Sequence, residues 1–145
     1  MNKFVGLFLL FPILALCQNN SLPKNYISIG LFDHKNGFSA ISYSRSILKN
    51  KDHELFLGCG SMIMFNTLTV GYKGYFIKSF ADGFYVASLQ KIYGMAGGPY
   101  SVFLSVGIEK KIWKVLFINA GININYLLDD LELLAFPSLN INIRL

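Results

Sequence analysis

The chain has 145 residues, of which 53% are hydrophobic and only 14% are charged, and its net charge is +5. A soluble domain of this size normally covers its surface with more charged side chains, about 25% of its residues. Beyond the N-terminus, no apolar run approaches the roughly 20 residues that a membrane-spanning helix needs. Two classes remain: a soluble protein with a very apolar core, and a membrane β-barrel, whose apolar residues alternate with polar ones.

The N-terminus predicts a cleaved secretory signal over residues 1–17. Lys3 gives it a positive start, residues 4–16 are apolar, and Ala15-Leu16-Cys17 fits a small-x-small cleavage site. We therefore expect one domain over residues 18–145. Lipidation of Cys17 is an alternative, although Leu16 stands where a small residue is expected. If Cys17 is removed, Cys59 is the cysteine that remains, and no internal disulfide can form.

Apolar and polar residues alternate most clearly in the last third of the chain. Such a period of two over segments 100–110, 114–126 and the last ten residues predicts β-strands. The apolar face comprises Tyr100, Val102, Leu104, Val106, Ile108, Leu116, Ile118, Ile122, Ile124, Leu139, Ile141 and Ile143. The polar face comprises Ser101, Ser105, Asn119, Asn123, Asn125, Ser138, Asn140 and Asn142, with Phe103 as a large apolar exception.

Earlier segments alternate less regularly but also predict strands. They cover residues 26–31, 55–60 and 68–76, and two segments with mixed faces, 37–48 and 83–93. Turn residues separate these segments: an Asn-Gly loop at 33–37, turns at 50–52, 66–67 and 81–83, and a glycine-rich loop at 94–99. The longest gap, 127–135, is long enough for one or two helical turns. The total is about eight strands.

The chemistry of the polar face indicates which side of the sheet meets water. A soluble lipocalin-like barrel would point its apolar face inward and would carry more Lys and Glu outside. Small Ser, Asn and Gly side chains suit the narrow interior of an eight-stranded barrel, and branched aliphatic side chains suit hydrocarbon. We therefore predict an all-β, eight-stranded antiparallel up-and-down transmembrane β-barrel. Both termini are expected in the periplasm, with loops 33–36, 66–67, 94–99 and 127–135 at the outer surface.

The signal peptide, the alternating strands and the C-terminal segment Phe136-Pro137-Ser138-Leu139-Asn140-Ile141-Asn142-Ile143-Arg144-Leu145 resemble the small eight-stranded outer-membrane β-barrel proteins of Bacteroidota-like bacteria. The resemblance implies location in the outer membrane of a Gram-negative bacterium, contact with outer-membrane lipid and insertion by the barrel-assembly machinery. Members usually end in an aromatic residue, whereas this chain ends in Leu145. We expect a monomer. We also expect no binding of nucleic acid, because the basic residues are scattered and an exported chain rarely meets nucleic acid.

Four charged residues fall on the predicted inner face. We predict that they form an ion-paired plug that closes the lumen, because isolated charges in a dry interior are costly. A proton or ion path is the bolder alternative. The predicted lumen plug comprises Glu54, Lys73, Glu109 and Arg144.

Aromatic residues on the apolar face are candidates for belts at the two membrane surfaces, where amphipathic rings are favoured. The predicted interface aromatics are Tyr43, Tyr72, Phe76, Tyr100 and Tyr126.

The sequence predicts no catalytic residue, no metal site and no cofactor. His34 beside Asp33 is expected in an outer loop and His53 beside Asp52 at an inner turn, so the two histidines would lie at opposite ends of the barrel. Cys59 is interpreted as a small lipid-facing residue. The leading hypothesis is a non-enzymatic structural or interaction protein. The alternatives are a soluble exported lipocalin-like barrel that binds a small apolar ligand, and a barrel enzyme that acts on outer-membrane lipid.

Overall fold

The computed structural model describes residues 25–50, 52–78, 80–94, 97–129 and 131–145. The predicted signal peptide, residues 1–17, and the alternative of lipidation at Cys17 lie outside the described residues. Over the described ranges, no helix has the length and hydropathy to cross a membrane.

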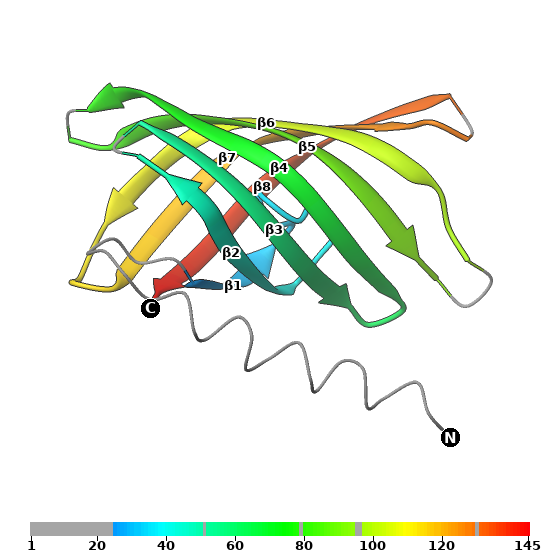
Figure 1. The fold of residues 1–145 in the computed structure, drawn as a ribbon, viewed down its shortest axis with the longest axis horizontal. Coiled ribbons are helices and arrows are strands. Elements are labelled where there is room, and N and C mark those ends of the chain that lie inside the picture. The colour runs from blue at the N-terminus through cyan, green and yellow to red at the C-terminus, as the bar shows by residue number, and fades with distance from the viewer. Residues whose placement is uncertain (1–24, 51, 79, 95–96, 130) are drawn as a thin grey trace.

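Eight strands form one closed antiparallel barrel, in which each strand pairs with the next and β8 pairs with β1 (Figure 1). The predicted all-β, up-and-down architecture is therefore confirmed. The strands are β1 (Asn25–Leu31), β2 (Ile41–Lys49), β3 (His53–Met62), β4 (Phe65–Lys78), β5 (Asp82–Tyr93), β6 (Tyr100–Lys111), β7 (Leu116–Leu127) and β8 (Glu132–Arg144).

The first and last described residues meet at one end of the barrel. Asn25 donates from its backbone nitrogen to the carbonyl of Leu145 at 3.3 Å, and Leu145 donates to the carbonyl of Asn25 at 2.9 Å. We call this the terminal end and the opposite one the distal end. Because neighbouring strands are antiparallel, the connections after β1, β3, β5 and β7 begin at the distal end.

Side-chain alternation places polar groups inside the barrel and apolar groups outside. Phe103, the exception noted in the sequence, is fully buried in the lumen and helps to fill it. The exposed outer residues include Leu57, Leu68, Leu89, Leu104, Val106, Ile108, Ile122, Leu139 and Ile141. The buried inner residues include Ser42, Ser44, Ser46, Thr69, Ser88, Ser101, Ser105, Asn123, Asn140 and Asn142.

Two predicted connections are wrong. The turn after β3 lies at Ile63 and Met64, because Met62 pairs with Phe65, so Asn66 and Thr67 already belong to β4. The gap at 127–135, which has room for one or two helical turns, contains no helix in its described residues, since Leu127 pairs directly with Glu132 at the start of β8. A helical turn of this length would be marginal by itself, whereas continuing the ladder pairs the backbone groups of both strands.

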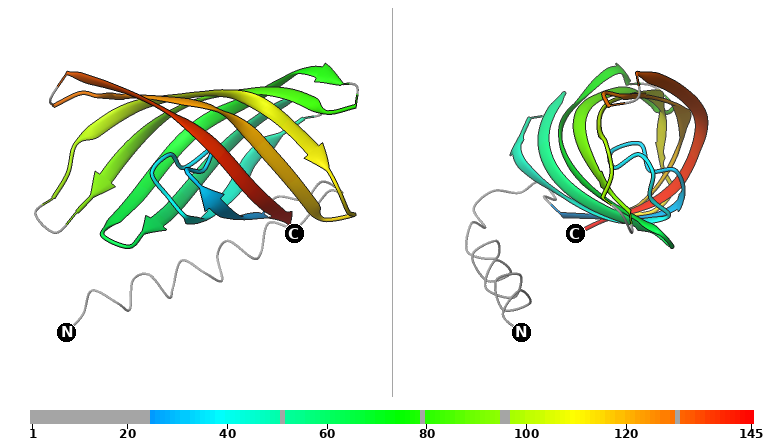
Figure 2. Two further views of the ribbon diagram at one scale, coloured as in Figure 1. Left: turned by 180° about the vertical axis from the view of Figure 1, so that it is seen from behind. Right: turned by 90° about the vertical axis from the view of Figure 1, so that its right-hand side faces the viewer.

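The connection between β1 and β2 does not face outward. The chain leaves β1 at Phe32, where φ is 52°, and residues 32–40 enter the barrel (Figure 2). We call this segment the lumen loop. The predicted outer position of loop 33–36 is wrong, since Asp33, His34, Lys35 and Asn36 are all buried.

Continuation of the alternation explains why the chain turns inward. Ile29 and Leu31 of β1 lie on the exposed outer face. If β1 continued as a regular strand, Asp33 and Lys35 would follow them onto the same apolar face, because the side-chain period of a strand is two. Turning into the lumen instead brings both charges to polar partners.

β8 continues beyond the distal end of β1. The pairing between these strands stops at Leu31 and Leu139, so the first part of β8 has no partner in β1. Three rings gather inside this part of the wall: the ring centroids of Phe32 and Phe136 lie 4.5 Å apart, and those of Phe38 and Phe136 lie 4.8 Å apart. The lumen loop thus contributes two rings to an apolar cluster against β8.

Candidate functional site

Two lumen-facing glycines of β3 make room for the lumen loop. An ideal Cβ atom on Gly58 would lie 2.9 Å from Cγ of Asn36, and one on Gly60 would lie 2.7 Å from Oγ of Ser39. Both distances are shorter than normal van der Waals contacts between such atoms. A side chain at either position would therefore overlap the side chain of Asn36 or Ser39 unless that side chain moved, which makes β3 a wall against which the loop is fitted.

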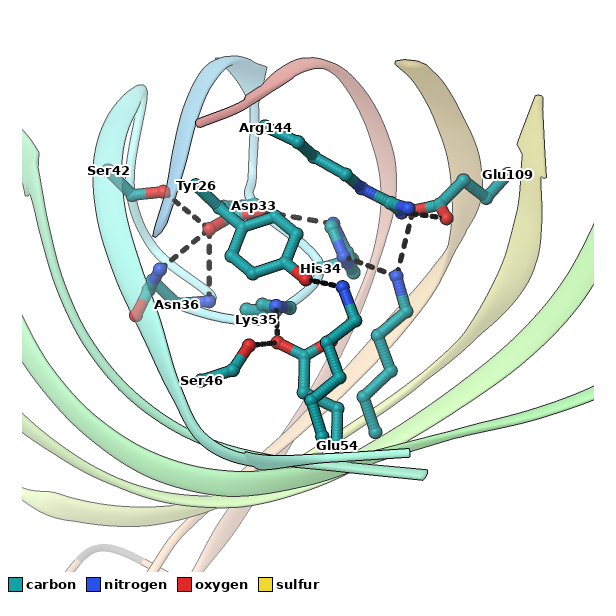
Figure 3. Close-up of polar contacts among 12 residues, drawn as sticks. Tyr26, Asp33, His34, Lys35, Asn36, Ser42, Ser46, Glu54, Glu109 and Arg144 are labelled. Carbon is teal, nitrogen blue, oxygen red and sulfur yellow. Dashed lines mark hydrogen bonds and ion pairs between the residues drawn. The ribbon is translucent and has the colours of Figure 1, made fainter. Parts of the chain in front are cut away.

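Asp33 anchors the loop to β2. Its Oδ2 atom accepts hydrogen bonds from Oγ of Ser42 at 2.5 Å and from Nδ2 of Asn36 at 2.8 Å, and its Oδ1 atom lies 3.1 Å from Nδ1 of His34 (Figure 3). Burial alone would raise the pKa of this carboxyl. The bonds from His34, Ser42 and Asn36 outweigh burial and hold the pKa below its usual range, so Asp33 is a carboxylate.

His34 lies at the centre of the polar contacts. Its Nε2 atom is 3.1 Å from Nζ of Lys73, and because an ammonium can only donate, Nε2 accepts and the ring proton is on Nδ1. Nδ1 lies 3.1 Å from the side-chain amide of Asn119 as well as from Asp33. Burial and the nearby charge of Lys73 lower the pKa of His34 to about 4, so this ring is neutral at neutral pH.

Lys35 pairs with Glu54, one of the residues predicted to plug the lumen. The lysine ammonium contacts Oε1 of Glu54, and Ser46 of β2 donates to the same oxygen at 2.6 Å (Figure 3). The ammonium also lies 3.7 Å from the ring centroid of Tyr26. A residue of the lumen loop is thus the direct partner of a charge on the barrel wall.

The other three predicted plug residues form a second cluster. Nζ of Lys73 donates to Oε2 of Glu109 at 2.9 Å, and the guanidinium of Arg144 contacts Oε1 of the same carboxylate. The hydroxyl of Tyr75 donates to Oε1 of Glu109 at 3.2 Å. The structure therefore places all four predicted charges inside the barrel, with Glu54 joined to the lumen loop and the others to one another.

Sequence reasoning missed the contribution of the lumen loop. Asp33, His34 and Lys35 were expected in solvent, yet each is buried and contacts the wall. The alternation of β1 contains a signal for these positions. If it continued, Asp33 and Lys35 would lie on the apolar outer face, which indicates that the strand ends before Asp33.

Charges of both signs lie inside the barrel. Among the described residues, two of the three buried carboxylates are ion-paired, Glu54 with Lys35 and Glu109 with Lys73 and Arg144. Asp33 is held by hydrogen bonds, and Lys49 of the wall contacts the hydroxyl of Tyr26. Pairing is needed because an uncompensated charge in the interior is strongly destabilising.

The five predicted interface aromatics all lie on the outer face. Their membership of membrane belts stays a prediction. Tyr72 and Phe76 lie on the half of β4 nearer the terminal end, where both rings pack near Tyr85. Tyr100 and Tyr126 lie near the distal ends of their strands, and Nζ of Lys91 is 3.8 Å from the Tyr100 ring centroid. The hydroxyl of Tyr43 donates to Asn25 at 2.9 Å, nearer the terminal end.

The structure does not bring the two histidines together. His53 is exposed on the outer side of β3, where its ring contacts Tyr72, whereas His34 is inside the lumen. Cys59 is exposed on the outer face between the two inward glycines. No group of three or more His, Cys, Asp or Glu side chains in the described part of the chain could hold a metal ion.

These features define the class of the molecule: a closed eight-stranded antiparallel barrel with an apolar exterior and an ion-paired interior that includes one of its own loops. Comparison with known proteins adds no relative, since no protein-family model, curated protein or solved structure matches the chain.

Proposed function

We propose that the chain is a small outer-membrane β-barrel with a closed, filled lumen, and that it serves as a structural or interaction protein and not as an enzyme. The distribution of side chains between the two faces carries the proposal. Large aliphatic side chains are exposed around the outside, while serine, asparagine and paired charges are buried. A protein surrounded by water arranges these groups the other way round.

Energetics support a lipid environment. Leaving a large aliphatic side chain in water forgoes about 1.5–3 kcal/mol of burial free energy, and many outward residues are exposed in the isolated chain. Hydrocarbon removes this loss but demands that backbone polar groups find partners within the protein. Closure of the barrel between β8 and β1 provides such partners over the paired region.

Strand length supports the same proposal. A tilted membrane strand needs about 9–11 residues. The strands from β2 to β8 have between 9 and 14 residues, whereas β1 has 7. The barrel wall is thus long enough to cross a bilayer, and the short β1 coincides with the inward turn of the lumen loop.

The terminal end combines aromatic and basic side chains in the way that favours a headgroup layer. Trp113 and Phe80 are strongly exposed in the terminal-end turns, and Nζ of Lys110 lies 3.4 Å from the ring centroid of Phe80. Lys111 and Lys114 are exposed in the same region. An anionic lipid surface is the partner that this combination fits.

Cell fractionation combined with gel migration tests the proposal. The full chain should reach the outer-membrane fraction, and the mature chain should require detergent and migrate differently with and without heating. A soluble product that quenches a bound hydrophobic dye would instead support the lipocalin-like alternative. That alternative needs an apolar cavity, whereas the described lumen is lined mainly by polar groups and occupied by the lumen loop.

The lipid-enzyme alternative has its own test. Its candidate residue, His34, is 0% exposed, so a lipid has no route to this ring in the described conformation. Overexpression of the native chain and of a His34→Ala variant should leave the cellular lipid profile equally unchanged. A lipid modification that depends on His34 would contradict the proposal.

A further inference from the structure

We propose that the lumen loop is a removable plug and that the barrel conducts small inorganic ions when residues 32–40 leave the lumen. This activity rests on the membrane location proposed above. The observation that supports the plug is that the lumen loop fills part of the interior of the barrel, together with the side chains of the strands.

Part of the wall facing the loop is made of small residues, beside the buried rings of Tyr26, Phe56 and Phe84. An eight-stranded barrel is just wide enough for its own side chains to fill it. Here β2 presents Ser42, Ser44 and Ser46 to the lumen, and β3 presents Gly58 and Gly60 beside them. Because these residues leave space, the interior is completed by the loop, and the space opens when the loop departs.

Many of the contacts that hold the loop are hydrogen bonds, and water can replace their partners. Thr67 donates to the carbonyl of Asn36 at 3.1 Å, and Asn140 donates to the carbonyl of Phe32 at 3.1 Å. A hydrogen bond that is exchanged for one to water changes the free energy little. The apolar part of the anchorage includes the cluster of Phe32, Phe38 and Phe136. The loop also contacts three aromatic rings of the wall, since the His34 ring lies 4.9 Å from that of Phe84 and the Lys35 ammonium lies over Tyr26 and Phe56.

The closed state also leaves polar groups without partners. Among the described residues, neither amide atom of Gln90 has a hydrogen-bond partner, and the same is true of Oδ1 of Asn36 and Oγ of Ser39. Gln90 is 2% exposed, and its Oε1 lies 2.6 Å from an ideal Cβ on Gly37 of the loop. Buried unpaired groups are costly, so water that enters behind the departing loop stabilises the open state.

Hydration of the separated charges permits the loop to leave. Departure breaks the ion pair between Lys35 and Glu54, whereas Glu109 keeps Lys73 and Arg144. Lys35 and Glu54 both meet water in the open state, so neither remains an uncompensated charge in a dry interior. A lumen with both signs on its wall should discriminate only weakly between K⁺ and Cl⁻.

A reversible crosslink tests the plug. Cysteines at positions 36 and 58 should form a disulfide, because Cγ of Asn36 lies 2.9 Å from the ideal Cβ of Gly58. The variant is Asn36→Cys/Gly58→Cys in a chain that also carries Cys17→Ser and Cys59→Ser. Conductance is recorded in planar bilayers with KCl. We expect brief openings when the pair is reduced and at least a tenfold loss of open time when it is oxidised.

A matched control crosslinks the wall without touching the loop. Leu104 of β6 and Ile124 of β7 are directly paired and both face outward. Oxidation of a Leu104→Cys/Ile124→Cys variant in the same background should leave the conductance unchanged. A loop-shortened variant, in which Asn-Gly replaces residues 33–38, should conduct continuously and show a reversal potential near zero in a KCl gradient.

The possible results distinguish failure of the plug proposal from failure of the membrane proposal. Conductance that persists in the oxidised 36–58 pair would overturn the plug. The plug would also be overturned if the reduced pair and the shortened variant both fail to conduct, once heat-modifiable migration has shown that they are inserted. If the shortened variant does not fold, the reduced pair decides. If no variant inserts into bilayers, the proposed function itself fails, and the inference falls with it.

Discussion

The side chain of Asn36 occupies the space that a side chain at Gly58 would need. Cγ of Asn36 lies 2.9 Å from the ideal Cβ position of that glycine. Gly58 is buried on the inner face of β3, and Asn36 is buried in the lumen loop. The absence of a side chain on one strand thus determines where a loop from another part of the chain can lie.

Replacing Gly58 with alanine should dislodge the loop. The added methyl group would overlap Asn36, and overpacking of this kind typically costs about 1–3 kcal/mol. We expect a lower urea midpoint for the loss of heat-modifiable migration, and faster proteolysis within residues 32–40. Cys59→Ala is the matched control, because Cys59 is the next residue and faces outward. Equal behaviour of the two variants would contradict the fitted loop.

Removing the charge of Glu109 should destabilise the barrel strongly. Glu109→Gln leaves Lys73 and Arg144 without their shared carboxylate, and breaking a buried ion pair from one side costs about 3–5 kcal/mol. The urea midpoint should fall, and adding Lys73→Met should restore part of it. Glu132→Gln, at the exposed start of β8, should have no measurable effect. A small loss at Glu109 would show that water screens this cluster.

A lysine on the outer wall distinguishes lipid from water. Ile122 is 62% exposed near the middle of β7. In a bilayer, Ile122→Lys should cost about 2–4 kcal/mol, whereas Leu131→Lys at the distal turn should cost about 0–1 kcal/mol. Folding yield into lipid vesicles measures both. In a soluble barrel neither lysine would matter, so equal yields with full solubility would reject the membrane location.

Acid should weaken the barrel through His34. In the unfolded chain a histidine binds a proton near pH 6.5, whereas burial lowers the pKa of His34 to about 4 in the folded chain. The unfolded state therefore binds more protons as the pH falls from 6.5 toward 4, and stability is lost over this window, approaching about 3 kcal/mol.

The pH effect has a matched variant. His34→Gln cannot take up this proton, so its urea midpoint should change less than that of the native chain between about pH 7 and pH 4.5. Unfolding monitored by heat-modifiable migration at both pH values provides the measurement. Parallel pH profiles for the two proteins would show that other groups cause the acid sensitivity.

Local patterning was sufficient to predict much of the barrel. The alternation in segments 100–110 and 114–126 predicted β6 and β7 closely. It also assigned Val106 and Ile122 to the outer face and Ser105 and Asn123 to the inner face, where the structure has them. A period of two is a property of the strand itself, so it can be read without knowing the neighbouring strands. The same alternation placed Glu54, Lys73, Glu109 and Arg144 on one face, although not their individual partners.

The sequence by itself thus determined that this protein has eight alternating strands and which face of them is polar. Only the tertiary structure decided that residues 32–40 turn into the lumen and that Lys35 meets Glu54 there. The physical reason is that the path of a loop depends on space and charge supplied by distant strands. The room left at Gly58 exists only once β3 lies beside β2 in the closed barrel.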